Sequence, residues 1–108
     1  MFSDVVAEFQ AALPGTESFK RVRVQCEALI RSQPEQATVC FVIGEFCRAY
    51  VLFYEDQEVR PAFAQTIKAQ LLGYMLNLDA ALQSDDPASL LQALNQVTQA
   101  YAGDRGLI

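Results

Sequence analysis

Histidine is absent from the 108 residues, so Ser-His-Asp and Cys-His nucleophilic systems are excluded. The three cysteines, Cys26, Cys40 and Cys47, include no Cys-x-x-Cys pair, so the usual zinc and redox patterns are also missing. Cys40 and Cys47 would lie about 10 Å apart along one helix, too far for a disulfide. We therefore expect reduced core thiols, which favours a cytoplasmic location.

Positive charge is scarce: eight Lys and Arg against thirteen Asp and Glu give a net charge of −5. Nucleic-acid phosphates are bound by clustered Lys and Arg. The local basic group formed by Lys20, Arg21 and Arg23 is typical of a solvated helix face. The sequence thus predicts no nucleic-acid partner.

Long uncharged apolar runs are missing too. The most apolar stretch, residues 39–54, is shorter than the roughly 18–20 residues that a membrane span needs, and Glu45 and Arg48 interrupt it. Near the N-terminus, Asp4 stands where a signal peptide would carry positive charge. We expect no membrane association and interpret residues 39–54 as a buried helix.

Apolar residues, which make up 52% of the chain, recur at three- and four-residue steps that predict helices over 4–13, 17–32, 35–54, 61–83 and 87–102. Short connections favour antiparallel neighbours. The predicted fold is an all-α, up-and-down bundle of four to five helices in a single domain, residues 1–108. The helix over 35–54 is apolar over a wide arc and is expected to be central.

Polar residues and prolines mark the predicted helix ends. Acids complement the positive N-terminal end of a helix, so Asp56 and Glu58 are assigned to the start of the fourth helix, with Pro61 in its first turn. The predicted N-terminal caps of the first, second and fifth helices are Ser3, Thr16 or Ser18, and Asp86.

The apolar faces of the helices include Leu13 in the first, Phe53 in the third and Leu91 in the fifth. Buried Tyr50 and Tyr54 would need hydrogen-bond partners for their hydroxyls. At helical spacing, such aromatic side chains are typical of ordinary packing rather than of a cofactor site. No cofactor and no catalytic residue is predicted.

One carboxylate group offers an alternative, enzymatic function. Paired Glu-x-x-Glu and Glu-x-x-Asp sequences on facing helices hold Mg²⁺ in helical nucleotide pyrophosphohydrolases. Here Glu55 and Glu58 supply the first half, but Leu76 stands three residues before Asp79, where the second half needs an acid. The alternative is a carboxylate- and Mg²⁺-dependent hydrolase, or a bundle that binds a small ligand.

Two apolar strips suggest an interaction surface. The first strip lies among the charged residues of the third helix. The second is a row of small residues in the fourth helix with leucines beside it. Exposed apolar patches of this kind mark contacts with other proteins. Alternatively, other helices cover the strips, and the row packs against Gly44 and the cysteine face of the third helix. The sequence predicts a non-enzymatic interaction module (an adaptor, chaperone or regulator) that forms a homodimer or binds another protein. Its candidate interface residues are Phe41, Leu52, Ala69, Leu72, Gly73 and Leu76.

Overall fold

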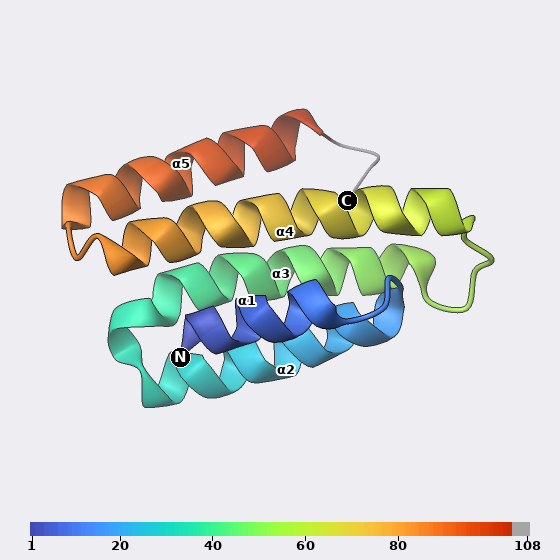
Figure 1. The fold of residues 1–108 in the computed structure, drawn as a ribbon, viewed down its shortest axis with the longest axis horizontal. Helices are drawn as coiled ribbons and strands as arrows, with labels where there is room; N and C mark the ends of the chain where they lie inside the picture. Colours follow the sequence, from blue (N-terminus) through green and yellow to red (C-terminus); the bar gives the residue numbers. More distant parts are fainter. Residues whose placement is uncertain (105–108) are drawn as a thin grey trace.

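The computed structural model describes residues 1–104, where it contains five α-helices and one short 3₁₀-helix. The helices alternate in direction along the chain, as an up-and-down bundle requires (Figure 1). The predicted all-α fold is confirmed, with helix ends within a few residues of those expected. The elements are α1 (Phe2–Ala11), α2 (Thr16–Ser32), η1 (Pro34–Gln36), α3 (Ala37–Tyr54), α4 (Pro61–Gln83) and α5 (Pro87–Gly103).

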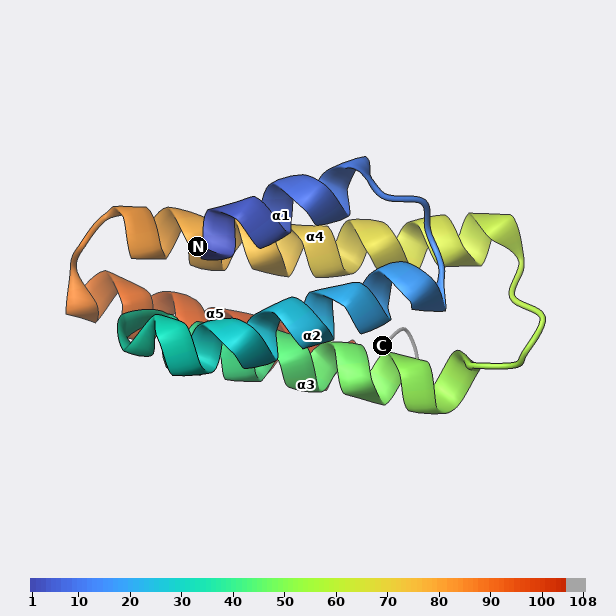
Figure 2. The same ribbon diagram turned by 90° about the horizontal axis from the view of Figure 1, so that it is seen from below.

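The five helices form two layers: α1 and α4 lie in one, and α2, α3 and α5 lie in the other (Figure 2). The most extensive pairing joins α2 to α3. There the ring of Phe19 stacks on that of Tyr50, with centroids 4.1 Å apart, and Cys26 is buried beside α3. The α2–α3 hairpin is therefore the best packed part of the bundle.

Helix α3 also contacts the other long helices. The ring of Phe46 stacks on Tyr101 of α5 with centroids 3.8 Å apart and meets the edge of Tyr74 of α4 at 5.8 Å. Its central position is confirmed. The predicted burial of Phe53 is wrong: that ring is exposed, because no neighbouring helix covers the last turn of α3 on that side.

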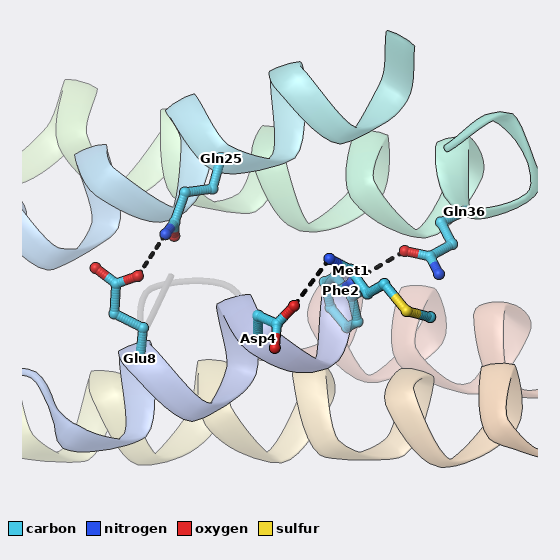
Figure 3. A network of polar contacts seen from close by, with 6 residues as sticks. All are labelled: Met1, Phe2, Asp4, Glu8, Gln25 and Gln36. Atoms are coloured by element: carbon cyan, nitrogen blue, oxygen red, sulfur yellow. Dashed lines mark hydrogen bonds and ion pairs between the residues drawn. The ribbon is translucent and has the colours of Figure 1, made fainter. Parts of the chain in front are cut away.

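The N-terminus of α1 is held by a side chain from η1. The backbone amide of Phe2 donates to Oε1 of Gln36 at 2.9 Å inside the bundle, and the terminal ammonium of Met1 pairs with Asp4 at 3.0 Å (Figure 3). The helix thus begins before Ser3, and the prediction that Ser3 caps it is wrong. Gln36 satisfies one of the amides that a helix N-terminus leaves unpaired.

The C-terminus of α1 is held by Lys68 of α4, which is buried. Its ammonium donates to the backbone oxygens of Gln10, at 3.0 Å, and of Ala12. A cation at this end complements the helix dipole and satisfies carbonyls that have no partner within the helix. The helix ends at Ala11, so Leu13 lies in the following loop and is exposed, contrary to prediction.

Besides Ser3, the predicted cap of α2 and the assignment of Asp56 and Glu58 to α4 are wrong, whereas Pro61 in the first turn of α4 is confirmed. Gly15, not Thr16 or Ser18, is the N-cap of α2, and its backbone has a φ of 126°. Asp56 and Glu58 belong to the loop before α4, because Asp56 has a φ of 65° and cannot continue a helix.

The predicted start of α5 is also confirmed. Asp86 accepts a hydrogen bond from the backbone amide of Ala88 at 3.2 Å and another from the hydroxyl of Ser89 at 2.8 Å. These hydrogen bonds, that of Ser89 first, lower the pKa of the Asp86 carboxyl. Pro87 occupies the first turn, as predicted.

The helical stretch Pro34–Tyr54 agrees with the predicted helix over 35–54. It spans 21 residues and contains an 18-residue window with a mean hydropathy of 1.5, which by length and composition alone is enough to cross a membrane. The core helix of a folded bundle satisfies the same criterion. Six of its side chains are buried against other helices, in keeping with a core helix: Val39, Cys40, Ile43, Phe46, Cys47 and Tyr50.

Candidate interaction surface

The row of small residues on α4 faces solvent along its whole length. Ala69 and Gly73 are exposed, as are Ala62 and Ala80 at either end. A Cβ atom added at Gly73 would meet no atom within 4 Å in the described chain. The alternative in which this row packs against α3 is therefore wrong.

The predicted partner of the small-residue row is occupied by another helix. A Cβ atom added at Gly44 would lie 3.7 Å from the Cβ of Cys26, an ordinary van der Waals contact between α3 and α2. Gly44 thus marks the helix pair that packs most extensively, as a glycine inside an apolar helix often does. The small-residue row of α4 therefore has no partner among residues 1–104.

The two leucines beside the row differ in exposure. Leu76 has 46% of its surface exposed, whereas Leu72 is half-buried against the core. Leu72 lies one helical turn after Lys68, on the side of α4 that faces α1. Of the two, only Leu76 belongs wholly to the free surface.

Phe41 and Leu52 form a second, separate strip on α3. Their exposed fractions are 58% and 70%, and the exposed ion pair between Glu45 and Arg48 lies between them, with an N–O distance of 3.7 Å. At 100° per residue this strip is about 140° around the helix from Phe46, which packs against α4 and α5. The six candidate residues therefore lie on two surfaces, not one.

Charge separates these two surfaces. Helices α4 and α5 together contain only two charged residues, Lys68 and Asp79. Lys68 is buried on the carbonyls of α1, and Asp79 is half-buried. The exposed sides of both helices, which we call the α4–α5 face, therefore carry no fully exposed charge.

Some exposed apolar residues were not among the candidates. Val24 of α2 and Leu91 of α5 are both exposed. Leu91 was predicted to be buried, but at 100° per residue it lies about 160° around the helix from buried Ala93. A strict reading of the helical period would have placed Leu91 on the free face of α5.

The carboxylates of the alternative hydrolase do not converge. Glu55 forms an ion pair with Lys20 of α2, and Glu58 lies in the loop before α4. Asp79 follows Pro61 by 18 positions, which is about 27 Å along a helix. Residues 1–104 contain no group of three or more side chains that could hold a metal ion.

All three cysteines are free and buried, as predicted. The thiol of Cys26 interacts with that of Cys40 between α2 and α3, and this interaction together with burial raises the pKa of Cys26. Burial also raises the pKa of Cys47. The thiolate is the reactive form of a cysteine, so both of these thiols are held in the unreactive state.

Comparison with known proteins yields no relative: no protein-family model, no curated protein and no solved structure matches this chain.

Proposed function

We propose that this protein is a non-enzymatic interaction module that self-associates through the α4–α5 face, and that it works as an adaptor, chaperone or regulator. The observation that carries the proposal is the missing charge on that face, together with the exposed row of Ala69, Gly73 and Leu76. A two-fold dimer brings the same surface of each copy together, so this row would meet its own copy.

Net charge makes a second copy the best fit for this surface. A chain of net charge −5 repels its own copy wherever charged faces meet. The α4–α5 face limits that repulsion because Lys68 is buried and Asp79, the other charged residue of the two helices, is half-buried. The outer side of α2 carries charge instead, including Arg21, Arg23 and Glu27.

The size of the face also suits a dimer. The 23 residues of α4 span about 35 Å and the 17 residues of α5 about 26 Å, and each helix is about 10 Å wide. The face therefore measures about 600 Å² per copy, within the range of specific interfaces. Small residues at Ala69 and Gly73 would let the partner helix approach closely.

Light scattering on variants with charge added to one face tests the proposal. Ala69→Glu with Leu76→Glu places two carboxylates on exposed positions of α4, where they would repel their copies across a two-fold axis. Leu72 is left unchanged because it packs against the core. We expect the wild type to be a dimer and this variant a folded monomer with unchanged circular dichroism.

The matched control is Phe41→Glu with Leu52→Glu, which adds the same charge to the exposed strip of α3. This variant should remain a dimer. Dissociation of the control alone would move the interface to α3. A wild type that stays monomeric at high concentration would contradict self-association altogether.

A further inference from the structure

A cleft of about 570 Å³ opens at the end of the bundle where the α1–α2 and α3–α4 loops lie (Figure 1). This volume lies within the roughly 300–1,000 Å³ that is usual for small-molecule sites. Its walls are apolar and aromatic, with Pro14 from one loop, Val59 from the other, and Tyr50 and Tyr54 from α3. A smaller hollow of about 370 Å³ continues past Tyr54 to Phe63.

The hydroxyl of Tyr50 has no hydrogen-bond partner among residues 1–104. Tyr50 is only 1% exposed and is held between the rings of Phe19 and Tyr54, at centroid distances of 4.1 and 4.9 Å. No hydrogen bond joins its hydroxyl to another described residue, contrary to the sequence-based expectation. Tyr50 is one of the residues that line the cleft.

The cleft carries negative charge beside aromatic rings. Asp56 is the only charged residue in the lining of the larger hollow, and it makes no ion pair with residues 1–104. In the smaller hollow, Glu58 and Arg60 offset one another. The rings of Tyr54 and Phe63 meet edge to face, 5.5 Å apart. Aromatic faces attract cations, and attraction grows where water is excluded.

Burial raises the pKa of Tyr50, so its hydroxyl is protonated at neutral pH and its oxygen can accept a hydrogen bond from a donor that enters the cleft. Gly15 and Thr16 at the N-terminus of α2 also border the cleft. A helix N-terminus alone favours an anion. The carboxylate of Asp56 and the faces of the aromatic rings repel an anion and attract a cation. These two features together favour a cation over the anion that the helix N-terminus alone would favour.

We propose that this cleft binds a small organic cation: an amine attached to an apolar, preferably aromatic, body. The ammonium group donates to the carboxylate of Asp56 and to the hydroxyl oxygen of Tyr50. The apolar body lies against Tyr54 and Val59. This site shares only Pro61 and Gln65 in the first turns of α4 with the α4–α5 face, and the cation contacts lie outside that face.

Three probes that share one skeleton but differ in charge test the proposal. At neutral pH benzylamine is a cation, benzyl alcohol is neutral and benzoate is an anion. Titration calorimetry on the full chain should show benzylamine binding about tenfold more tightly than either of the others. In NMR spectra, its shifts should concentrate at Gly15, Thr16 and Gln57, which border the cleft.

Variants separate charge from shape. Asp56→Asn removes the carboxylate and keeps a residue type that tolerates a φ of 65°, so benzylamine affinity should fall about fivefold while benzyl alcohol affinity stays the same. Tyr50→Phe should weaken benzylamine about threefold, through loss of one hydrogen bond. The matched control is Asp85→Asn at the far end of the bundle, where the backbone φ is 54°. This variant should bind benzylamine as the wild type does.

Several results would overturn the proposal. These are benzoate or benzyl alcohol binding as tightly as benzylamine, an equal loss in the Asp85→Asn control, spectral shifts away from the cleft, or no saturable binding of benzylamine. A wild type that is monomeric would contradict the proposed function but leave this site standing, since Tyr50, Tyr54 and Asp56 lie outside the α4–α5 face.

Discussion

The α2–α3 and α4–α5 hairpins are both antiparallel pairs of long helices, but they differ in what they bury and in what they expose. The α2–α3 pair buries large apolar side chains such as that of Ile43, and it also buries all three cysteine thiols. Helix α5 contributes only Ala93 and Val97 to the fully buried core. The exterior of α2 and α3 is charged, whereas that of α4 and α5 is not.

This difference indicates a division of roles within one small bundle. Buried apolar area supplies most of the stability of a fold, and here the α2–α3 pair and the inner side of α4 contribute most of it, whereas α5 contributes little. Exposed charge keeps that pair soluble and solvated. The α4–α5 pair adds less to the core and leaves an uncharged surface free, which makes it the better candidate for contact with another molecule.

The largest expected effect concerns thiol protection in the α2–α3 hairpin. Native Cys26, Cys40 and Cys47 should react with a thiol reagent at least about a hundredfold more slowly than in the unfolded chain, because exposing them requires an opening that costs about 3 kcal/mol or more. Leu91→Cys on exposed α5 supplies a fast-reacting control in the same molecule. Rapid labelling of the native cysteines would show that this hairpin is loosely packed.

Core truncation compares the two hairpins directly. Ile43→Ala in α3 should lower the free energy of unfolding by about 2–5 kcal/mol, because Ile43 is fully buried. Val97→Ala in α5 should cost about 1.5 kcal/mol, for two methylene equivalents. Urea unfolding followed by circular dichroism measures both. Equal losses of unfolding free energy in the two variants would contradict the view that α5 contributes less to stability than α3.

Glycine substitution sharpens the comparison further. Gly73→Ala adds a methyl group that meets no atom of residues 1–104, so helix propensity should raise the free energy of unfolding by up to about 1 kcal/mol. The same methyl should weaken the proposed dimer, because it separates the two α4 helices.

Gly44→Ala is the matched control for that substitution. Its methyl meets Cys26 at an ordinary contact distance and should leave self-association unchanged. Thermal melts on both variants measure stability, and light scattering measures self-association. A dimer that Gly73→Ala does not weaken would argue against close approach of α4 to its copy.

The smallest expected effect is at the start of α5. The pKa of Asp86 is lowered, so its cap stabilises the fold above the unfolded-state pKa, near pH 4, and this contribution is lost as the pH falls through the lower folded-state pKa. Asp86→Asn should therefore melt slightly below the wild type at neutral pH, and the difference should vanish in acid. Asp85→Asn serves as the control, since its carboxylate makes no hydrogen bond in the described chain. A difference that persists in acid would contradict the argument.

Local signals predicted α4 and α5 well because those signals lie within a few residues of each helix end. Asp86 followed by Pro87 defines the start of α5 without help from the rest of the chain. The assignment of Asp56 and Glu58 to α4 failed because the chain needs a loop of several residues to cross from one layer to the other. Dipole complementarity is a weak preference and did not outweigh that requirement.

The candidate surface shows the same limit. Leu72 and Leu76 are four residues apart on one helix, and periodicity cannot separate them. Their different exposure arises because α1 packs along one side of α4, where Lys68 binds its carbonyls. The cleft at Tyr50 could not be predicted either, since two loops that are distant in the sequence form its walls.

The sequence by itself determined that this protein is a helical bundle without histidine chemistry, and it placed most helix ends and most of the core, because helical period and capping are local properties. Only the tertiary structure decided which apolar residues remain uncovered. The period of a helix sets the angle between its side chains, but burial depends on which neighbouring helix lies at that angle. For this reason Phe41, Leu76 and Leu91 are exposed while Ile43 and Leu78, equally apolar, are not.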